Sequence, residues 1–201
     1  MLFDATQEQF AETVRSFARD RLKPRYARWE REPFSRGLVG ELTAELGELG
    51  VLGLLVPANR GGSGADFVAA GIASEELARG DFNVTNFVQL SSIAALALGS
   101  WAAPDLAERW LPRIASGEVG PALALTEPDA GSDAAAISTS ARRDGDCWVI
   151  TGEKASMTFA GYADAAIVFA RTGGPGAGGI SAFWVPLGDD VTRQVIDTVG
   201  G

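Results

Sequence analysis

The chain has 201 residues, 46% of them hydrophobic, so it can bury a sizeable core in one large domain or two small ones. Its net charge of −9, from 26 acidic and 17 basic residues, argues against nucleic-acid binding, which depends on clustered lysine and arginine. Histidine is absent and Cys147 is the single cysteine. The usual zinc sites, an internal disulfide and the Ser–His and Cys–His dyads are therefore excluded, and we expect no metal site.

The N-terminal residues show no basic segment followed by an apolar one, so neither a secretory signal nor a transit peptide is visible. We therefore expect a cytoplasmic protein. The most apolar stretch, Ile93 to Trp101, is too short to span a bilayer, so it is predicted to be a buried helix rather than a membrane insertion. Cys147 lies in an apolar run beside Trp148, which favours packing over a reactive thiol.

Helical periodicity dominates the first part of the chain. Thr6 and Gln9 form a capping-box pattern that opens an amphipathic helix, and Lys23-Pro24 is expected to close it. Ser35 is the expected cap of a second helix with a leucine stripe. Further helices are predicted over about 66–78, 85–101 and 104–116.

Two patterns in the helical part suggest chemistry that a structural reading explains better. The run from Asn59 to Gly64 is glycine-rich, but it lacks the Lys-Ser/Thr of a phosphate-binding loop, so an inter-helix turn is predicted. Glu75 and Glu76 are adjacent acids, which point in different directions on a helix. We expect a solvated face with at most one of the two buried.

From Gly120 the hydrophobic period falls to two, which is typical of strands. Ile137, Thr139 and Ala141 alternate with polar residues, and Asp144-Gly145 indicates a hairpin turn. Strands are also predicted over 165–170 and 180–185, and another strand is expected to begin shortly before Gly200-Gly201. The fold class is therefore α+β: an all-α helical bundle over 1–118, followed by an antiparallel sheet or barrel domain over 119–201.

The most informative stretch runs from Leu123 to Ser132, LALTEPDAGS. A short buried strand is expected to end at Thr126, because proline at 128 cannot donate to a sheet ladder. Gly131 is free to take positive φ, and such a loop can turn several main-chain N–H groups toward an anion. An ordinary strand-to-loop exit would have the same composition.

A second motif favours the ligand-binding interpretation of this stretch over an ordinary loop. TEP-x-AGSD is followed about twenty residues later by GEKASMT, at 152–158, and the two together resemble the acyl-CoA dehydrogenase family. The likeness extends over the order of elements from Met1 to Trp184. It implies that FAD binds the middle β domain, which would be incomplete here. It also implies that the family's C-terminal helical domain, which carries the base glutamate, is absent from this chain, so no catalytic residue is assigned.

The resemblance implies a set of flavin-lining positions in the two motifs. In the family, Thr126 would lie near the pyrimidine edge, Ser132 near the pyrophosphate and the acyl-CoA substrate, and Thr158 at flavin N5, while Glu127 is structural. Ser156 departs from the family, which usually has an aromatic residue there, and the serine would open space for a branched or cyclic acyl group. The full cofactor-binding set is Leu123, Ala124, Leu125, Thr126, Gly131, Ser132, Ser156, Met157 and Thr158.

The activity that the resemblance implies is α,β-desaturation of an acyl-CoA or carrier-bound thioester, with electrons passed to an electron-transfer flavoprotein. A homo-oligomer, dimer or tetramer, or a hetero-oligomer is expected, and this chain alone is expected to be inactive. Two alternatives stay open: a truncated, non-catalytic paralogue that serves as an interaction module, and an oxidase of the same fold.

Overall fold

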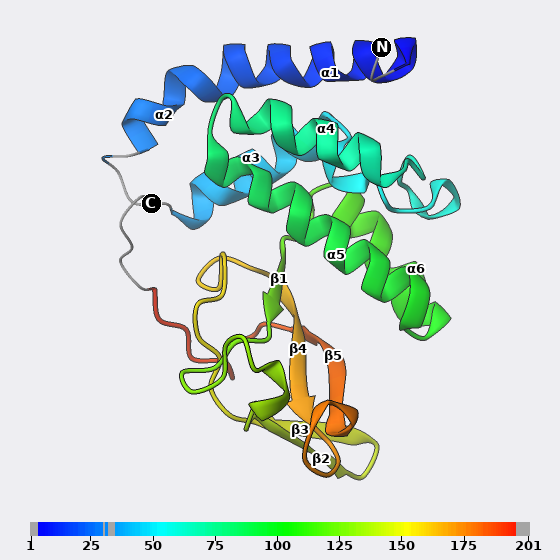
Figure 1. Ribbon diagram of the computed structural model, residues 1–201, viewed down its shortest axis with the longest axis vertical. Helices are drawn as coiled ribbons and strands as arrows, with labels where there is room; N and C mark the ends of the chain where they lie inside the picture. The colour runs from blue at the N-terminus through cyan, green and yellow to red at the C-terminus, as the bar shows by residue number, and fades with distance from the viewer. Residues whose placement is uncertain (1–3, 30, 32–34, 196–201) are drawn as a thin grey trace. The chain divides into compact units, whose positions relative to one another are not determined.

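A computed structural model describes residues 4–29, 31 and 35–195 of the chain. It contains two compact units, the first comprising residues up to Gly120 and the second beginning at Pro121 (Figure 1). The first unit is helical and the second contains a sheet, so the α+β class is confirmed.

Helices make up most of the first unit. The predicted helices over 66–78, 85–101 and 104–116 are present, each with boundaries within about one residue of the expectation. Within the described residues, the α-helices are α1 Ala5–Phe17, α2 Lys23–Trp29, α3 Arg36–Glu48, α4 Phe67–Ala78, α5 Thr85–Trp101 and α6 Pro104–Ala115. Side chains with no more than 1% exposure at the centre of this unit include Val14, Leu22, Leu42, Leu46, Leu77, Val88, Leu111 and Ile114.

The start of α1 differs from the sequence prediction. Asp4, not Thr6, is the N-cap: its side chain accepts from the Gln7 amide at 2.8 Å, and the Gln7 side chain accepts from the Asp4 amide at 3.1 Å. The motif is a capping box, but it lies two residues earlier than expected. Aspartate caps a helix at least as well as threonine, and Asp4 comes first along the chain, so the helix begins directly after Asp4.

Lys23-Pro24 does not end the first helix either. A π-helical turn, Ala18–Leu22, leads directly into α2, and the Lys23 amide bonds back to the Ala18 carbonyl. Proline is tolerated near the start of a helical segment because its missing N–H is not needed there. The wider turn therefore lets the chain continue as a helix through the proline.

The remaining helical caps agree with the sequence. Ser35 caps α3 by accepting from the Leu38 amide at 3.2 Å, and the central leucines of the stripe, Leu42 and Leu46, are fully buried. Of the acidic pair on α4, Glu75 is exposed and Glu76 is buried, which confirms the expectation of at most one buried member.

Helix α5 is the most apolar element. With the short turn before it, it forms a 20-residue segment, Phe82–Trp101, that is long and apolar enough to cross a membrane by length and composition alone. Such a segment is weak evidence for a membrane span, because the core helix of a soluble protein passes the same test. Here Phe87, Val88, Ala94 and Leu98 are buried, and α5 packs against α4 and α6.

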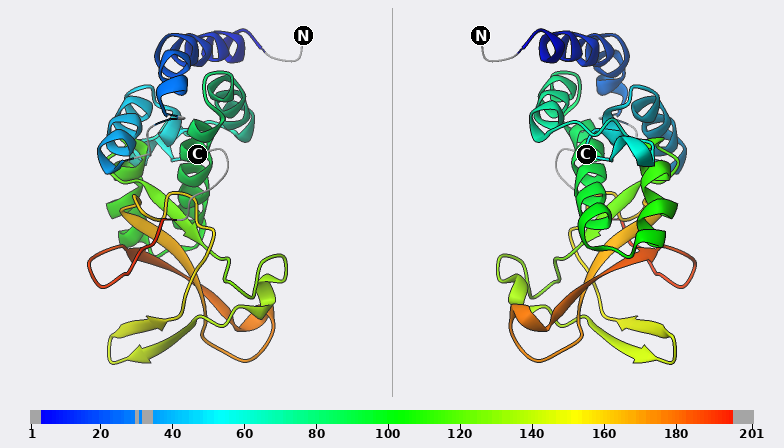
Figure 2. Two further views of the ribbon diagram at one scale, coloured as in Figure 1. Left: turned by 90° about the vertical axis from the view of Figure 1, so that its left-hand side faces the viewer. Right: turned by 90° about the vertical axis from the view of Figure 1, so that its right-hand side faces the viewer.

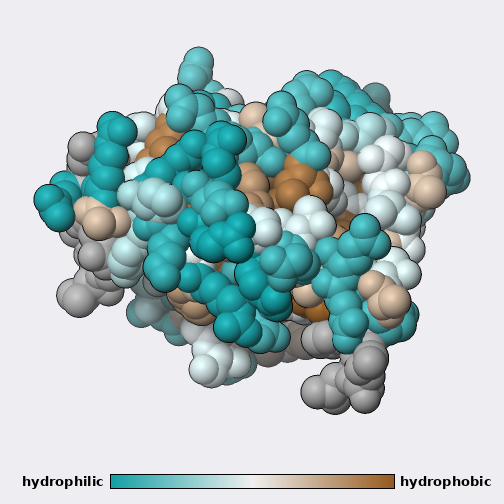
Figure 3. All heavy atoms as spheres, turned by 90° about the horizontal axis from the view of Figure 1, so that it is seen from above, coloured by the Kyte–Doolittle hydropathy of each residue, from teal (hydrophilic) through white to brown (hydrophobic). Residues whose placement is uncertain are grey.

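The outer surface of the helical unit is mostly polar around α1. Figure 3, which looks down on that helix, shows hydrophilic side chains over most of the visible face with a few apolar atoms between them. Arg15 belongs to α1 and Arg19 to the π-helical turn after it, and both form ion pairs with acidic neighbours. This arrangement is typical of a solvated helix face.

The second unit contains a five-stranded sheet, in which β4 is paired on both sides (Figure 2). β2 and β3 form the predicted hairpin, with Gly145 in the turn at φ 61°, and β4 and β5 are antiparallel. β1, however, runs parallel to β4, so the sheet is mixed and the wholly antiparallel prediction is wrong. The strands are β1 Pro121–Ala124, β2 Ser140–Asp144, β3 Cys147–Thr151, β4 Ala165–Arg171 and β5 Ile180–Pro186.

The parallel pair has a direct physical consequence for the motifs. Parallel strands need a long crossover connection, and the connection between β1 and β4 is the whole segment 125–164, which includes the β2–β3 hairpin and both motifs. Cys147 starts β3 and is exposed, so its predicted packing role is wrong. A strand near the end of the chain was also expected; none is present up to residue 195, and 196–201 lie outside the described residues.

Candidate cofactor-binding site

The first motif leaves the sheet where β1 ends at Ala124 and closes at once into a tight turn. The Glu127 amide donates to the Ala130 carbonyl at 3.0 Å, and the Ala130 amide donates back to the Glu127 carbonyl at 3.2 Å. Pro128 lies inside this turn and is exposed, where its missing N–H costs nothing. The turn therefore fixes the backbone directly before Gly131 and Ser132.

The carboxylate of Glu127 is buried, and three chain segments meet at it. Oε2 accepts from the Ser138 amide at 2.6 Å and from its hydroxyl at 2.7 Å. Oε1 accepts from the Thr139 amide at 3.0 Å and from Lys154 Nζ at 2.8 Å. Both oxygens are thus occupied, as a buried carboxylate requires.

Lys154 joins the first motif to the second. Its side chain is 8% exposed, and its ammonium donates to the carboxylate of Glu127, whose side chain is 4% exposed, and to the Leu125 carbonyl at 3.0 Å. One residue later, the Ala155 amide donates to the Thr126 carbonyl at 2.9 Å. The TEPDAGSD and GEKASMT segments therefore lie side by side, bonded through both main chain and side chains.

The environment of Glu127 makes it unsuitable as a proton acceptor. Burial alone would raise the pKa of this carboxyl, but hydrogen bonds from Lys154, Thr139 and Ser138 outweigh it and hold the pKa well below its usual range. A general base needs a pKa near the working pH and a free lone pair. Glu127 has neither, in agreement with its structural role in the resembled motif.

Left-handed backbone is concentrated in the second motif rather than the first. Ser156 has φ 53° and Phe159 has φ 60°, and they are the non-glycine residues of positive φ in the described chain. Gly131, which was expected to supply positive φ, is not among the residues that adopt it. Non-glycine residues are held in this region only where the surroundings over-determine them, which happens often at ligand sites.

The nine residues predicted to line a flavin fall into two groups. Ala124 and Met157 belong to the sheet core, where they pack with Ala122, Ala166 and Val168, so their side chains point into the protein. The other seven are exposed or half-buried: Leu123, Leu125, Thr126, Gly131, Ser132, Ser156 and Thr158. Seven positions are thus accessible for contact with a ligand, Met157 is half-buried against the core, and Ala124 is buried and can contribute only through its backbone or through packing.

The accessible residues fit a ligand rich in hydrogen-bonding groups. Within the part of the chain that the structure describes, the hydroxyls of Thr126, Ser132, Ser156 and Thr158 make no hydrogen bond to other protein groups. They come from two segments that are bonded to each other, and their neighbours Gly131 and Ala155 are small. FAD carries ring carbonyls, ring nitrogens and a pyrophosphate, all of which hydroxyls and main-chain amides can bind.

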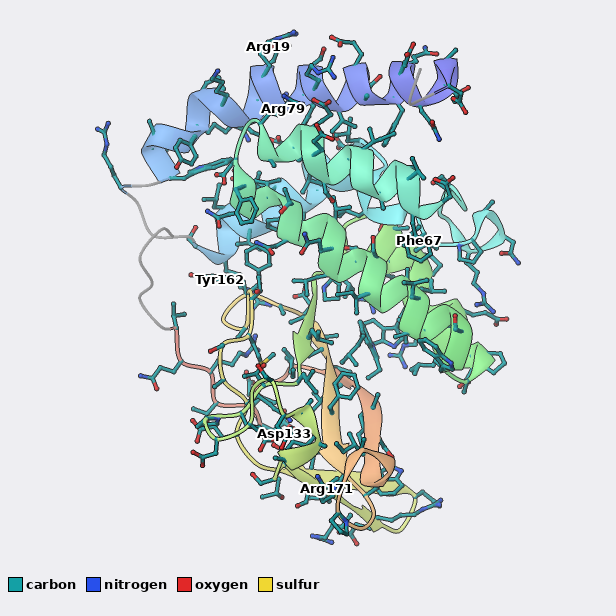
Figure 4. The ribbon with its side chains drawn as sticks, in the orientation of Figure 1. Arg19, Phe67, Arg79, Asp133, Tyr162 and Arg171 are labelled. Atoms are coloured by element: carbon teal, nitrogen blue, oxygen red, sulfur yellow. The ribbon has the colours of Figure 1, made fainter. Side chains whose placement is uncertain are left out.

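Sequence reasoning missed several residues that hold these loops. Arg171, at the end of β4, donates to the Ala135 carbonyl at 2.7 Å and to the Gly174 carbonyl at 2.8 Å, so it connects the loop after Asp133 to the glycine-rich loop after β4 (Figure 4). Lys154 was named in the motif but given no role. No pattern in the sequence distinguishes these basic residues from solvated ones, because their acceptors lie far away along the chain.

Comparison with known proteins agrees with this geometry. Residues 4–118 match the family model described as "Acyl-CoA dehydrogenase, N-terminal domain", and residues 122–200 match the one described as "Acyl-CoA dehydrogenase, middle domain". The chain belongs to the acyl-CoA dehydrogenase family. The two matches meet close to the change from helices to strands.

Several relatives are similar over most of the chain. A human mitochondrial short-chain specific acyl-CoA dehydrogenase is 38% identical over 90% of this chain, and a Dictyostelium discoideum mitochondrial isobutyryl-CoA dehydrogenase is 33% identical over 89%. A glutaryl-CoA dehydrogenase from Mycobacterium smegmatis, solved in complex with FADH2, is 35% identical over 92% of this chain with a TM-score of 0.80.

The chain spans less than half the length of these relatives. It covers 44% of the human protein, 42% of the Dictyostelium protein and 46% of the Mycobacterium smegmatis structure. The match is therefore to the helical and middle domains of the family, which are the two units that the structure contains.

Proposed function

We propose that this chain is the helical and flavin-binding part of an FAD-dependent acyl-CoA dehydrogenase that performs α,β-desaturation of an acyl thioester. The observation that carries the proposal is the junction of the two motifs, through Ala155 to Thr126 and Lys154 to Glu127, together with four motif hydroxyls that make no hydrogen bond to the protein groups that the structure describes. The relative solved with FADH2 supports the choice of cofactor.

Within this proposal each accessible hydroxyl has a distinct task. Thr158 would hydrogen-bond the flavin edge at N5, Thr126 the pyrimidine edge, and Ser132 the pyrophosphate, with Ser132 also toward the acyl-CoA substrate. FAD, when bound, supplies the hydride acceptor of the reaction. The protein's own contribution is to offer fixed donors where negative charge develops, which needs no reorganisation at the moment of reaction.

The proton-abstracting carboxylate is proposed to lie outside the described residues. Glu127 is saturated with hydrogen bonds, and Glu76 is held by Arg15 and Arg79 in the helical unit. A chain without a base would bind flavin and substrate but would not turn over. We therefore propose that desaturation needs a further segment or subunit, that the assembly is a dimer, a tetramer or a hetero-oligomer, and that electrons pass to an electron-transfer flavoprotein.

A branched or cyclic acyl group is the proposed substrate class. Ser156 is exposed and stands where the family usually has an aromatic residue, which leaves room beside the flavin ring. The similarity to an isobutyryl-CoA dehydrogenase supports a branched acyl group. The test compares turnover of butyryl-CoA, isobutyryl-CoA and cyclohexanecarboxyl-CoA by the product of the complete reading frame. A strong preference for butyryl-CoA would contradict the proposal.

Flavin binding itself is tested on the chain as it stands. The chain is titrated with FAD while flavin fluorescence and the visible absorption bands are followed, with FMN and riboflavin as controls. Saturable binding with shifted bands is expected. A chain that stays colourless and leaves flavin fluorescence unchanged would instead support the non-catalytic interaction module. Oxygen uptake on addition of substrate to the flavin-loaded product of the complete reading frame would identify an oxidase.

A further inference from the structure

We infer that Glu127 and Lys154 are positioning residues: their buried ion pair sets the register of the two motif segments, so that Thr126, Ser132, Ser156 and Thr158 face one ligand together. This inference rests on the proposed flavin function and goes one step further, because neither residue is expected to touch the flavin. In this inference the ion pair, and not the sheet, fixes how the two motif segments are aligned with each other.

The sheet cannot set that register by itself. β1 ends at Ala124, and β3 ends at Thr151, so residues 125–139 and 152–164 have no ladder of their own. Between the two segments the main chain contributes the bond from the Ala155 amide to the Thr126 carbonyl. The Thr139 hydroxyl also donates to the Glu153 carbonyl at 3.4 Å, close to the ends of the β2–β3 hairpin. Residues 125–127 share only that one main-chain bond with the second segment, so a further attachment point is needed to fix their orientation relative to it.

Lys154 supplies the second attachment. Its ammonium bonds to Leu125 on one side of the main-chain bond and to Glu127 on the other side, at 3.0 and 2.8 Å. Glu127 then carries the connection onward to Ser138 and Thr139, the residues before β2. The carboxylate of Glu127 therefore joins three segments of the crossover: the first motif, the residues before β2 and the second motif.

The chemistry of the pair suits positioning. An ammonium buried to this degree is costly unless its donors are satisfied, so alternative positions of either loop that separate the pair are strongly disfavoured. Ser156, two residues after Lys154, keeps a left-handed backbone conformation that a free loop would abandon. The pair therefore holds the loop in a conformation that its own sequence does not favour.

Lys154→Met is the direct test, since methionine keeps most of the length and removes the charge and the donors. We expect at least tenfold weaker FAD binding in the titration, and at least tenfold faster amide hydrogen exchange at Ala155. Lys154→Arg is the conservative variant and should recover part of both effects. Glu76→Gln, which changes another buried, ion-paired carboxylate, is the matched control and should leave FAD binding unchanged.

The double variant Glu127→Gln, Lys154→Met separates positioning from stability. It leaves no buried charge unpaired, so its thermal unfolding should be closer to wild type than that of Lys154→Met. Methionine cannot donate to the Leu125 carbonyl, however, so exchange at Ala155 should stay fast and FAD binding weak. Recovery of both in the double variant would mean that only the unpaired charge mattered, and would overturn the inference.

The two proposals fail in different ways. If the wild-type chain does not bind FAD, the proposed function is contradicted for this chain. The exchange measurement, which needs no flavin, then decides the role of the pair in setting the register. Equal exchange at Ala155 in wild type and Lys154→Met would overturn the inference, whether or not FAD binds.

Discussion

Among the described residues, each unit contains one buried, ion-paired glutamate, and the two differ in what surrounds them. Glu76 in the helical unit accepts from Arg15 at 2.7 and 2.9 Å and from Arg79 at 3.0 Å, and both arginines are about half exposed. Glu127 in the sheet unit is bonded to a buried lysine, two main-chain amides and a hydroxyl. The first ties one helix to another at their surface, whereas the second organises a region without regular structure.

This difference shows which interactions determine the conformation of each unit. The helices are defined locally by caps and by apolar stripes, so Glu76 joins elements that already exist. The two motif segments of the sheet unit lie outside the strands, and the main chain joins them through the bond from the Ala155 amide to the Thr126 carbonyl. Their conformation depends on polar contacts, which are strong only because they are buried.

The largest effect is expected when both carboxylates are neutralised in turn. Glu127→Gln leaves a buried ammonium without its counter-charge and should destabilise the sheet unit by about 3 kcal/mol. Glu76→Gln leaves arginines that solvent can reach, so roughly 1 kcal/mol is expected in the helical unit. Urea unfolding combined with hydrogen exchange resolved by peptide measures each unit separately. Equal losses in the two variants would show that the two environments are equivalent after all.

Alanine substitutions at two glycines should destabilise the protein where the glycine lies against another segment and have little effect where it lies in an open loop. Gly152 has φ 153°, and a Cβ there would meet the backbone and hydroxyl of Thr139, so Gly152→Ala is expected to cost about 2 kcal/mol. Gly131 is open and does not use positive φ, so Gly131→Ala should change stability by less than about 0.5 kcal/mol. Thermal unfolding of both variants is the measurement. A large loss for Gly131→Ala would contradict the observed loop geometry.

The buried environment of Glu127 also predicts how the stability of the sheet unit depends on pH. The pKa of Glu127 is lowered on folding, so its contribution is complete above the ordinary value of 4.5 and is lost as pH falls below it. At pH 3.5 the wild type should have lost about 1.4 kcal/mol relative to pH 7 through this group. Glu127→Gln lacks the titrating group and should lose correspondingly less between the same pH values. Parallel curves for both proteins would exclude Glu127 as the source.

The sequence predicted most of the fold because the signals for it are local. Helix α5 was predicted with its observed ends, and the turn at Gly145 was placed correctly, since periodicity and turn residues lie within a few positions of each other. Strand direction was not predictable in this way. A short, wholly apolar strand such as β1 has the same sequence pattern whether its partner runs parallel or antiparallel, so the pairing with β4 had to come from the structure.

In the candidate site, too, local features could be predicted from the sequence and long-range contacts could not. The two motifs identified the segments that meet, but not what joins them, because Lys154 reaches an acceptor 27 residues earlier and Arg171 reaches one 36 residues earlier. Left-handed backbone was also assigned to the wrong place. Gly131 is merely permitted to adopt positive φ, while Ser156 and Phe159 are held there by surroundings that a linear sequence does not display.

The smallest expected effect tests whether the loop at Ser156 is held against its own preference. Ser156→Gly removes the cost of left-handed backbone, about 1–2 kcal/mol, and adds unfolded-state freedom of about 0.5–1 kcal/mol, so a net gain of roughly 0.5 kcal/mol is expected. Ser132→Gly, at an exposed serine without positive φ, gains nothing and should lose about 0.5 kcal/mol. The opposite signs, read from thermal unfolding, make the pair informative despite the small size. If both variants are destabilised equally, Ser156 is not strained, and the case that the Glu127–Lys154 pair holds this loop is weakened.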